Sequence, residues 1–380
     1  MGLRMVTDVC VVGAGIVGLA HALEARRRGL DVVVIEREER AIGASVRNFG
    51  HVFVTGMADG PALDYALAAR ERWLELAPAA GLEVIAGGSV LVARHDDELE
   101  VLEHVATDER RCARMLTPAE VAELAPIPTE SLLGALHARL DLRVDPRRAA
   151  AALAGLLARD PGARLLWSAH VHAIEPGAVF AEETVVHAAE ILVCPGPSYG
   201  ALPPLVRPRR EGLTRCRLQM LRVGSPPGRR YVPALLTGLS LIRYPAFTSA
   251  PAAARVRARL AAAEPDAVAA GIHLIVTQLA DGDLILGDTH DYGDSPAPFA
   301  DERLDEIVLA HARELLGAAH LPVRERWQGS YPSAPGDPFL VQSPMAGVRV
   351  IEVVSGIGMT TALGLAGAVL DDLGAAQRAA

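Results

Sequence analysis

The 380-residue sequence contains no lysine, because all 37 of its basic residues are arginine. A chain without lysine cannot form a Schiff base with a carbonyl substrate or with pyridoxal phosphate, and it cannot supply the lysine of a triphosphate-binding P-loop. Lysine-dependent Schiff-base enzymes and P-loop enzymes are therefore excluded, whatever the reason for the absence of lysine.

Cysteine is scarce and scattered. The four cysteines are Cys10, Cys112, Cys194 and Cys216, and none stands at the spacing of a zinc site or a redox pair. We expect neither a disulfide framework nor a bound metal ion. The net charge is −9, and no basic stripe is interleaved with aromatic residues, so we also expect no nucleic-acid partner.

Long apolar runs are missing as well. No uncharged stretch reaches the roughly 18–20 residues that a membrane span requires. The apolar N-terminal stretch is interrupted by glycines and continues into a basic helix, which is unlike a signal peptide. The sequence therefore predicts a soluble, cytoplasmic protein, with two cores because one core rarely grows past about 250–300 residues.

The first 36 residues predict a complete βαβ unit. A buried strand leads into Gly13, Gly15 and Gly18 at the spacing G-x-G-x-x-G, with Ile16 inside the motif, and a helix through Arg28 follows. A second apolar strand ends at Glu36, whose carboxylate can accept hydrogen bonds from ribose hydroxyls. This context predicts a dinucleotide cofactor with its pyrophosphate at the helix N-terminus.

Later segments predict two interleaved domains. Apolar runs at 191–194 and 348–354 extend a buried parallel sheet, whereas the runs at 82–92, 213–223, 271–279 and 283–287 indicate a second, mostly antiparallel sheet. Helices are expected at 62–77, 146–158, 252–263 and 301–316. The predicted class is α/β, with a Rossmann-like cofactor domain (1–78, 140–212 and 325–380) interleaved with an α+β substrate domain (79–139 and 213–324).

Two further motifs favour FAD over NAD. The loop after Arg37 combines small residues, including Gly50, with donors from Ser45, Arg47 and Asn48. Near the C-terminus a turn of small residues starts an apolar helix. The backbone N–H groups of that turn can therefore meet the negative edge of a reduced flavin. The residues of that turn are Gly356, Gly358, Met359 and Thr360.

With these motifs the chain resembles the D-amino-acid oxidase and glycine oxidase family of FAD enzymes. Residues 43–51 resemble a Gly-Thr-Ser-x-x-Asn-x-Gly stretch of bacterial D-amino-acid dehydrogenases, 218–220 resemble a Gly-Gln-Met strand, and 326–329 match Trp-x-Gly. The resemblance implies Val171 at the adenine end of FAD, Pro195 and Gly196 along the pyrophosphate, and Met359 beside the flavin. No Cys or His stands at a recognised attachment position, so we expect FAD to be bound non-covalently.

The sequence departs from this pattern at the substrate anchor. Family members that act on α-amino acids continue Trp-x-Gly-x-Arg-Pro, whereas this chain has Tyr331-Pro332. Together with its other motifs, the replacement resembles a branch of the family associated with aminophosphonate breakdown, which implies substrates such as N-methylated aminoethylphosphonate. The cationic or phenolic donors suited to such an anion are Arg47, His51, Arg243, Tyr244, His290 and Tyr331.

The sequence therefore predicts FAD-dependent oxidation of a small amine. A hydride would pass from the α carbon to flavin N5, water would hydrolyse the imine, and oxygen or another acceptor would reoxidise the flavin. We expect His51, Tyr331 and Met359 at the reaction centre, and His51, Arg243, Tyr244, His290 and Tyr331 around the substrate. A surface position for Arg243 and a turn-closing role for Asp288 and His290 remain open alternatives.

Three other functions remain open at this stage. A D-amino-acid oxidase or dehydrogenase shares most of the motifs. An NAD(P)H-dependent flavin hydroxylase shares the first fingerprint and carries a Gly-Asp segment that Gly287-Asp288 resembles. A flavin-bearing subunit without activity of its own is the third. The sequence does not fix an oligomeric state.

Overall fold

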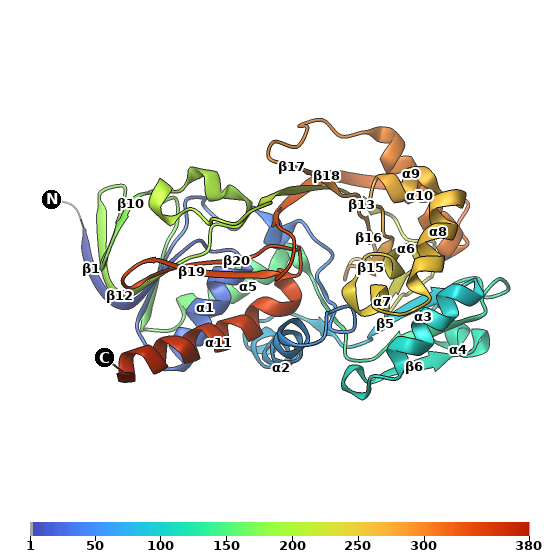
Figure 1. The fold of residues 1–380 in the computed structure, drawn as a ribbon, viewed down its shortest axis with the longest axis horizontal. Coiled ribbons are helices and arrows are strands. Elements are labelled where there is room, and N and C mark those ends of the chain that lie inside the picture. Colours follow the sequence, from blue (N-terminus) through green and yellow to red (C-terminus); the bar gives the residue numbers. More distant parts are fainter. Residues whose placement is uncertain (1–2, 380) are drawn as a thin grey trace.

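The computed structural model describes residues 3–379, and side chains over residues 3–373. Residues 1, 2 and 380, which fall within the predicted cofactor segments, lie outside the described residues. The chain forms two lobes side by side, each built on its own sheet (Figure 1). No helix in the described part of the chain is long and apolar enough to cross a membrane.

The first lobe is built on an eight-stranded sheet. Its centre is five parallel strands in the order β20, β12, β1, β2, β9. A β10–β11 hairpin and strand β19 extend it by antiparallel pairing. The strands are β1 (Arg4–Val12), β2 (Val32–Ile35), β9 (Ala163–Leu166), β10 (Val171–Glu175), β11 (Ala178–Ala181), β12 (Thr184–Val193), β19 (Phe339–Met345) and β20 (Val348–Val353).

The apolar runs of these strands supply two cores at once. In β1, Val9 and Val11 pack beneath the helices, whereas Cys10 and Val12 face the opposite side and pack near the hairpin. Because both faces are covered, the strands are continuously apolar rather than alternating. The covering helices are α1 (Ile16–Arg27), α2 (Pro61–Ala79), α5 (Pro146–Ala158) and α11 (Gly358–Ala379).

The second lobe is built on a nine-stranded sheet that is antiparallel except where β5 meets β14. Strand β13 hydrogen bonds along its length with β18. The strands are β5 (Ser89–Ala93), β6 (Ala113–Leu116), β7 (Gly134–Ala138), β13 (Thr214–Val223), β14 (Ala234–Leu236), β15 (Ile275–Gln278), β16 (Leu284–Gly287), β17 (Asp291–Gly293) and β18 (Val323–Ser333).

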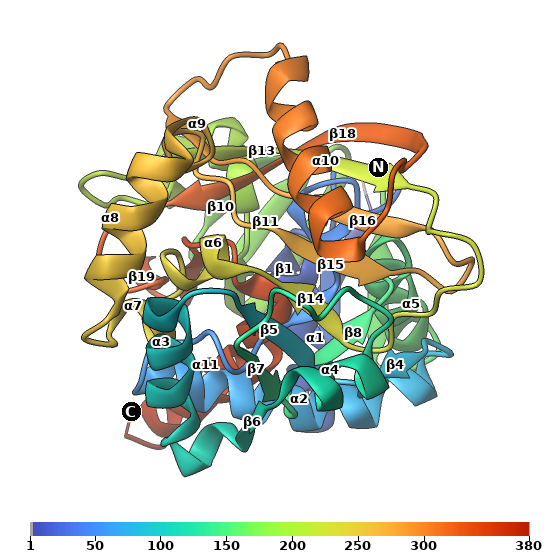
Figure 2. The same cartoon turned by 90° about the vertical axis from the view of Figure 1, so that its right-hand side faces the viewer.

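Helices cover the outer side of this second sheet, as Figure 2 shows for α3, α8 and α10. The helices of this lobe are α3 (Asp96–Ala106), α4 (Pro118–Leu124), α6 (Gly238–Leu241), α7 (Pro245–Thr248), α8 (Ala253–Ala263), α9 (Pro265–Ala269) and α10 (Glu302–Leu316). A small sheet of β3 (His51–Val52), β8 (Leu142–Val144) and β4 (Val84–Ile85) lies where the chain passes between the lobes.

The predicted fold class is confirmed: a cofactor-type parallel sheet is interleaved in sequence with a mostly antiparallel one. Helix α5 occupies the predicted range 146–158. One segment lies elsewhere than predicted: residues 325–333, assigned to the cofactor domain, belong to β18 in the second sheet. Their alternating side chains match an antiparallel strand, and β13 beside them supplies the hydrogen bonds.

The start of α11 is held by the buried side chain of Trp73 on α2. Its indole Nε1–H donates to the carbonyl of Met359 at 2.9 Å, and the side chain is fully buried. A carbonyl in the first turn of a helix normally accepts from within that helix, so this contact adds a cross-helix restraint. The first turn of α11 is thereby fixed against the rest of the first lobe.

We predict that Trp73→Ala lowers the free energy of unfolding by about 3–5 kcal/mol, because it leaves a large cavity and removes the hydrogen bond to Met359. Trp167→Ala, at a half-buried position of the same lobe, is the control and should cost clearly less. Urea unfolding of the two variants measures the difference, and equal losses would contradict the proposed importance of Trp73.

Candidate cofactor and substrate site

One continuous cavity runs from the first lobe into the second. At one end it is lined by the turn after β1, the end of β2, the loop 41–49 and residues 169–171. Residues 194–198 and the start of α11 line its middle, and Arg243, Tyr244, His273, Asp288, His290 and Tyr331 line the other end. A cavity of this form suits a long ligand from the first lobe that presents a reactive end to the second.

The three fingerprint glycines have different physical reasons to be glycine. Gly13 has φ +107°, and a Cβ there would lie 2.4 Å from the Cys194 carbonyl oxygen. A Cβ on Gly18 would lie 1.9 Å from the Gly13 carbonyl oxygen, so Gly18 serves helix–strand packing and does not line the cavity. A Cβ on Gly15 would meet only Ser45 Oγ, at 3.2 Å, and would otherwise project into the cavity.

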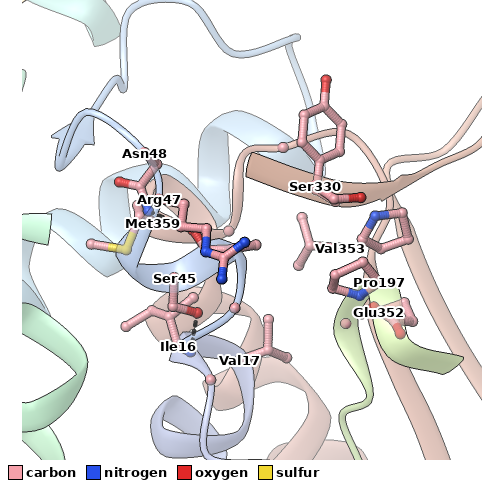
Figure 3. A pocket seen from close by; sticks show the side chains of 18 of the residues that line it. Ile16, Val17, Ser45, Arg47, Asn48, Pro197, Ser330, Glu352, Val353 and Met359 are labelled. Carbon is pink, nitrogen blue, oxygen red and sulfur yellow. Dashed lines mark hydrogen bonds between the residues drawn. The ribbon is translucent and has the colours of Figure 1, made fainter. Parts of the chain in front are cut away.

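The N-terminus of α1 opens toward the cavity. The Ile16 N–H donates to Ser45 Oγ at 2.8 Å, the interaction drawn in Figure 3. In the same view Arg47 extends past Ser45, while Pro197, Glu352 and Val353 lie across the space. The helix N-terminus, the serine hydroxyl and the guanidinium form a donor set that fits a pyrophosphate.

The Glu36 carboxylate lies at the end of β2, where the sequence predicts a ribose acceptor. It accepts from the Ala14 N–H at 2.8 Å and from the Glu38 N–H at 3.1 Å. Two backbone donors fix the carboxylate while lone pairs remain for ribose hydroxyls. Arg37, Val171, Pro195 and Gly196, which we also expect to bind the cofactor, all line the cavity, and Arg37 donates to Ser198 Oγ at 2.9 Å.

Two residues of the loop after β2 differ from their predicted use. Asn48 lines the cavity, but its amide donates to the Ala44 carbonyl at 2.9 Å and its Oδ1 accepts from the Gly50 N–H at 2.7 Å. Gly50 does not line the cavity; it has φ +66°, and a Cβ there would lie 1.8 Å from the Val144 carbonyl oxygen. Asn48 and Gly50 therefore shape the loop that presents Ser45.

The segment just before α11 brings a glycine against an aromatic ring. Gly356 has φ +73°, and a Cβ there would be 2.9 Å from Tyr331 Cζ. Gly358 and Met359 line the cavity. The Thr360 hydroxyl accepts from the Phe53 N–H at 3.0 Å, so Thr360 ties the helix start to the segment after β3.

His51 lines the cavity as an uncharged ring rather than as a cation. Its Nε2 is 2.7 Å from Ser89 Oγ, and its ring stacks on Phe53 with centroids 4.6 Å apart. Burial lowers the pKa of His51 to about 3, and the positive charge of Arg143 adds to the effect. In a Ser–His–Asp triad the serine and the aspartate contact different ring nitrogens of the histidine. Here Ser89 and Asp141 both face His51 Nε2, with Asp141 Oδ2 at 3.9 Å, so the grouping is not such a triad.

Arg243 and Tyr331 meet at the far end of the cavity. Arg243 Nη2 donates to the Tyr331 hydroxyl at 3.0 Å, and Arg243 Nε is buried without a hydrogen-bond partner. Among the described side chains, no carboxylate oxygen lies within 4.0 Å of the guanidinium. The surface position left open for Arg243 is therefore wrong, because the side chain lines the cavity.

His273 and Asp288 are lining residues that the sequence interpretation did not select. His273 lies just before β15 on the face that Ile275 also presents to the cavity, so the period of two along this predicted strand was an available signal. Asp288 follows β16, and its Oδ1 is 3.2 Å from His273 Nε2. His290 lies beside them, with its ring centroid 4.7 Å from that of His273.

His273, Asp288 and His290 place three potential ligand atoms within 4.8 Å of one another. Two features argue against a cation there. His273 Nδ1 is buried without a partner, whereas metal-bound histidines almost always donate their second N–H to an oxygen. The positive charge of Arg243 also acts on this group. We therefore assign no metal to the three residues.

The cavity fits FAD on observations independent of any relative. The unobstructed position of a Gly15 Cβ, the donors at the start of α1 and the carboxylate of Glu36 match the needs of a dinucleotide. Ser355 and Glu352 line the middle of the cavity, and each has a buried oxygen without a hydrogen-bond partner. Polar atoms left unpaired inside a cavity suit a polar ligand.

The chain matches the model of the family described as FAD dependent oxidoreductase over residues 8–372. It therefore belongs to that family and is an FAD-dependent oxidoreductase. The Gly-Asp segment considered for a flavin hydroxylase belongs to the second lobe, where Asp288 follows β16 and lines the cavity.

Known proteins similar to this chain include three that act on amines or amino acids by name. L-proline dehydrogenase from P. horikoshii aligns with a TM-score of 0.78 and 17% identity over 98% of this chain and 95% of that one. Glycine oxidase from Geobacillus kaustophilus aligns with a TM-score of 0.75 and 20% identity over 96% and 94%. Gamma-glutamylputrescine oxidoreductase from Escherichia coli (strain K12) is 51% identical over 45 residues, which is 12% of this chain and 11% of that enzyme.

We predict that Gly15→Ala weakens FAD binding by about tenfold or more, equivalent to about 1.4 kcal/mol, while the protein stays folded. The added methyl group meets only Ser45 within the protein but projects toward the pyrophosphate site. Gly155→Ala in α5, where a Cβ meets nothing within 4 Å, is the matched control. Equilibrium dialysis against FAD gives both affinities, and equal values for the two variants would refute this position for the pyrophosphate.

Proposed function

We propose that this enzyme oxidises a small amine that carries an anionic group, and that the anion is a phosphonate on an N-alkylated aminoethyl chain. The observation that carries the proposal is the Arg243 guanidinium, which lines the cavity with a buried, unpaired Nε and no carboxylate partner. A cation held in this way lacks the compensation that buried charges normally have. A substrate anion supplies it.

Two tyrosine hydroxyls that line the cavity favour a phosphonate over a carboxylate. Tyr331 and Tyr244 both act electrostatically on the Arg243 guanidinium. Burial raises the pKa of both phenols, so each stays protonated and can donate a hydrogen bond. One guanidinium with these neutral donors suits three phosphonate oxygens, whereas a carboxylate is satisfied by one bidentate arginine.

Tyr331 also explains why the arginine after Trp-x-Gly is dispensable in this chain. An arginine at position 331 would place a second cation against Arg243, which already contacts the tyrosine hydroxyl. The anion anchor therefore comes from the segment between α6 and α7 instead of from β18. Tyr331 orients that anchor and keeps its own donor at the same end of the cavity.

The residues around the reaction centre hold the substrate and exclude water. FAD bound in this cavity supplies the two-electron oxidation, accepting a hydride from the carbon next to the amine. Arg243 fixes the anion, and thereby the direction in which the carbon chain points. The stacked rings of His51 and Phe53 and the side chain of Met359 form a wall of the cavity without ionised groups.

A carboxylate substrate is the second candidate, because the fold is that of glycine oxidase and Arg243 can also bind a carboxylate. The two candidates separate with one pair of compounds. N-methyl-2-aminoethylphosphonate and N-methyl-β-alanine have the same carbon spacing and differ in the anion.

We predict that the phosphonate has at least a tenfold higher kcat/KM than N-methyl-β-alanine, D-alanine or glycine, about 1.4 kcal/mol of specificity. Arg243→Gln should lower kcat/KM for the phosphonate by 100-fold or more, about 2.7 kcal/mol, because a charge-assisted contact is lost. The exposed Arg255→Gln on α8 is the control and should match the wild type. Initial rates with oxygen and with an artificial electron acceptor also identify the acceptor.

Two results would contradict the proposal. Faster oxidation of D-alanine or glycine than of the phosphonate would assign the anchor to a carboxylate. An Arg243→Gln enzyme with wild-type kcat/KM for the phosphonate would remove Arg243 from the site altogether.

A further inference from the structure

Asp288 Oδ2 and His290 Nε2 are two hydrogen-bond acceptors that face each other without a donor between them. His290 Nδ1 lies 2.9 Å from the Gly271 carbonyl oxygen, which only accepts, so the ring proton is on Nδ1. In the neutral ring Nε2 is then an acceptor. It faces Asp288 Oδ2 at 3.9 Å, a spacing too long for a hydrogen bond between them.

The backbone beside this carboxylate is fixed by the protein, because the N–H groups of residues 273 and 288 each donate to the other's carbonyl, at 3.4 and 3.2 Å. Asp288 Oδ1 lies 3.2 Å from His273 Nε2 but is buried without a hydrogen-bond partner. Asp288 is 4% exposed and lines the cavity. Its backbone is therefore fixed, while its carboxyl oxygens remain available to a ligand.

A group with N–H donors satisfies both acceptors at once, and the ammonium of the substrate is such a group. Arg243 and Asp288 interact electrostatically without forming an ion pair of 4.0 Å or less. Once Asp288 is ionised, a cation and an anion held apart in one cavity fit the two ends of a zwitterion. This argument rests on the proposed function, since it needs an amine with an anionic group.

We propose that Asp288 receives the substrate ammonium, with His290 Nε2 as the second acceptor, and takes its proton before the amine is oxidised. One N–H bond of the ammonium breaks, its electron pair stays on nitrogen, and an O–H bond forms on Asp288. The amine lone pair is then available to assist the departure of hydride from the adjacent carbon. Asp288 is thus a catalytic base, and the main-chain pairing with residue 273 positions it.

The proton affinity of Asp288 fits this role. Burial raises the pKa of Asp288 to about 8, although the Arg243 charge and a backbone hydrogen bond act in the opposite direction. When an anion binds Arg243, it cancels part of the charge that holds this pKa down. Anion binding therefore favours transfer of the proton to Asp288.

The other groups that face Asp288 are uncharged near neutral pH. Burial lowers the pKa of His273 and brings that of His290 to about 3. Burial raises the pKa of the Cys216 thiol on β13 to about 11 and raises the pKa of the phenols around it. Those phenols belong to Tyr244, Tyr292 on β17 and Tyr331 on β18. Among these groups, the Arg243 guanidinium is therefore the one that carries a formal charge and acts on the pKa of Asp288.

The test compares pH profiles of Asp288→Asn and the wild type. Wild-type kcat/KM should rise with pH as Asp288 ionises. It should fall again near pH 10, where the ammonium of the free substrate loses its proton; the pKa of lysine, about 10.4, serves as the reference for such an amine. Asp288→Asn should lose about 100-fold or more at pH 7 and recover steadily toward pH 10, because only the free amine then reacts. The exposed Asp291→Asn, which loses only a pair with Arg217, should keep the wild-type profile.

A substrate with a more acidic ammonium separates a base from a structural residue. The 1,1-difluoro derivative of N-methyl-2-aminoethylphosphonate is such a compound, and it should restore most of the lost activity of Asp288→Asn near pH 7. A purely structural role would lower both substrates equally. FAD content and unfolding temperature of the variant establish that it is folded.

The outcomes are distinguishable from failure of the proposed function. If no amine with an anionic group reduces the wild-type flavin, the proposed function fails. If such an amine does reduce it but Asp288→Asn keeps the bell-shaped wild-type profile, the role of Asp288 is refuted. Stoichiometric divalent metal in the purified enzyme, lost in Asp288→Asn and needed for activity, would also overturn the proposal.

Discussion

A guanidinium held in a cavity without a carboxylate beside it is the constraint around which this site is built. Arg243 comes from a short segment between α6 and α7, and its Nη2 contact with Tyr331 fixes its direction. The Tyr331 ring in turn packs against Gly356, where a side chain would collide with it. Arg243, the segment just before α11 and strand β18 are therefore linked by direct contacts.

The two lobes contribute different parts of the chemistry. The turn at Gly13–Gly15, Glu36 and the loop that carries Ser45 follow strands of the parallel sheet, and all of them line the part of the cavity that we assign to the nucleotide. The antiparallel sheet carries Tyr331 and places His273 and Asp288 at the ends of its strands. Because the cavity crosses from one lobe to the other, specificity can change in the second lobe without altering cofactor binding.

The sequence predicted the nucleotide end well because its signals are local. Three glycines, an acid and two strands lie within about one βαβ unit of roughly 30 residues, and their spacing alone limits the geometry. The helix at 146–158 was equally local, with proline at its start and a clear apolar period.

The substrate end was predicted only in part, because its residues come from distant segments. Arg243, His290 and Tyr331 were selected by residue type and motif position, but Asp288 and His273 meet only through pairing of the β15 and β16 ends. The neutral state of His51 follows from burial, which depends on tertiary packing. Likewise the shift of residues 325–333 into the second sheet depends on β13 as a long-range partner.

Anaerobic titration of the flavin-loaded enzyme tests the central claim most directly. N-methyl-2-aminoethylphosphonate should bleach the flavin absorbance, whereas N-methylpropylamine, which has no anionic group, should leave it unchanged at the same concentration. Equal bleaching by both compounds would show that the buried Arg243 charge does not select the substrate, and it would contradict this account of the site.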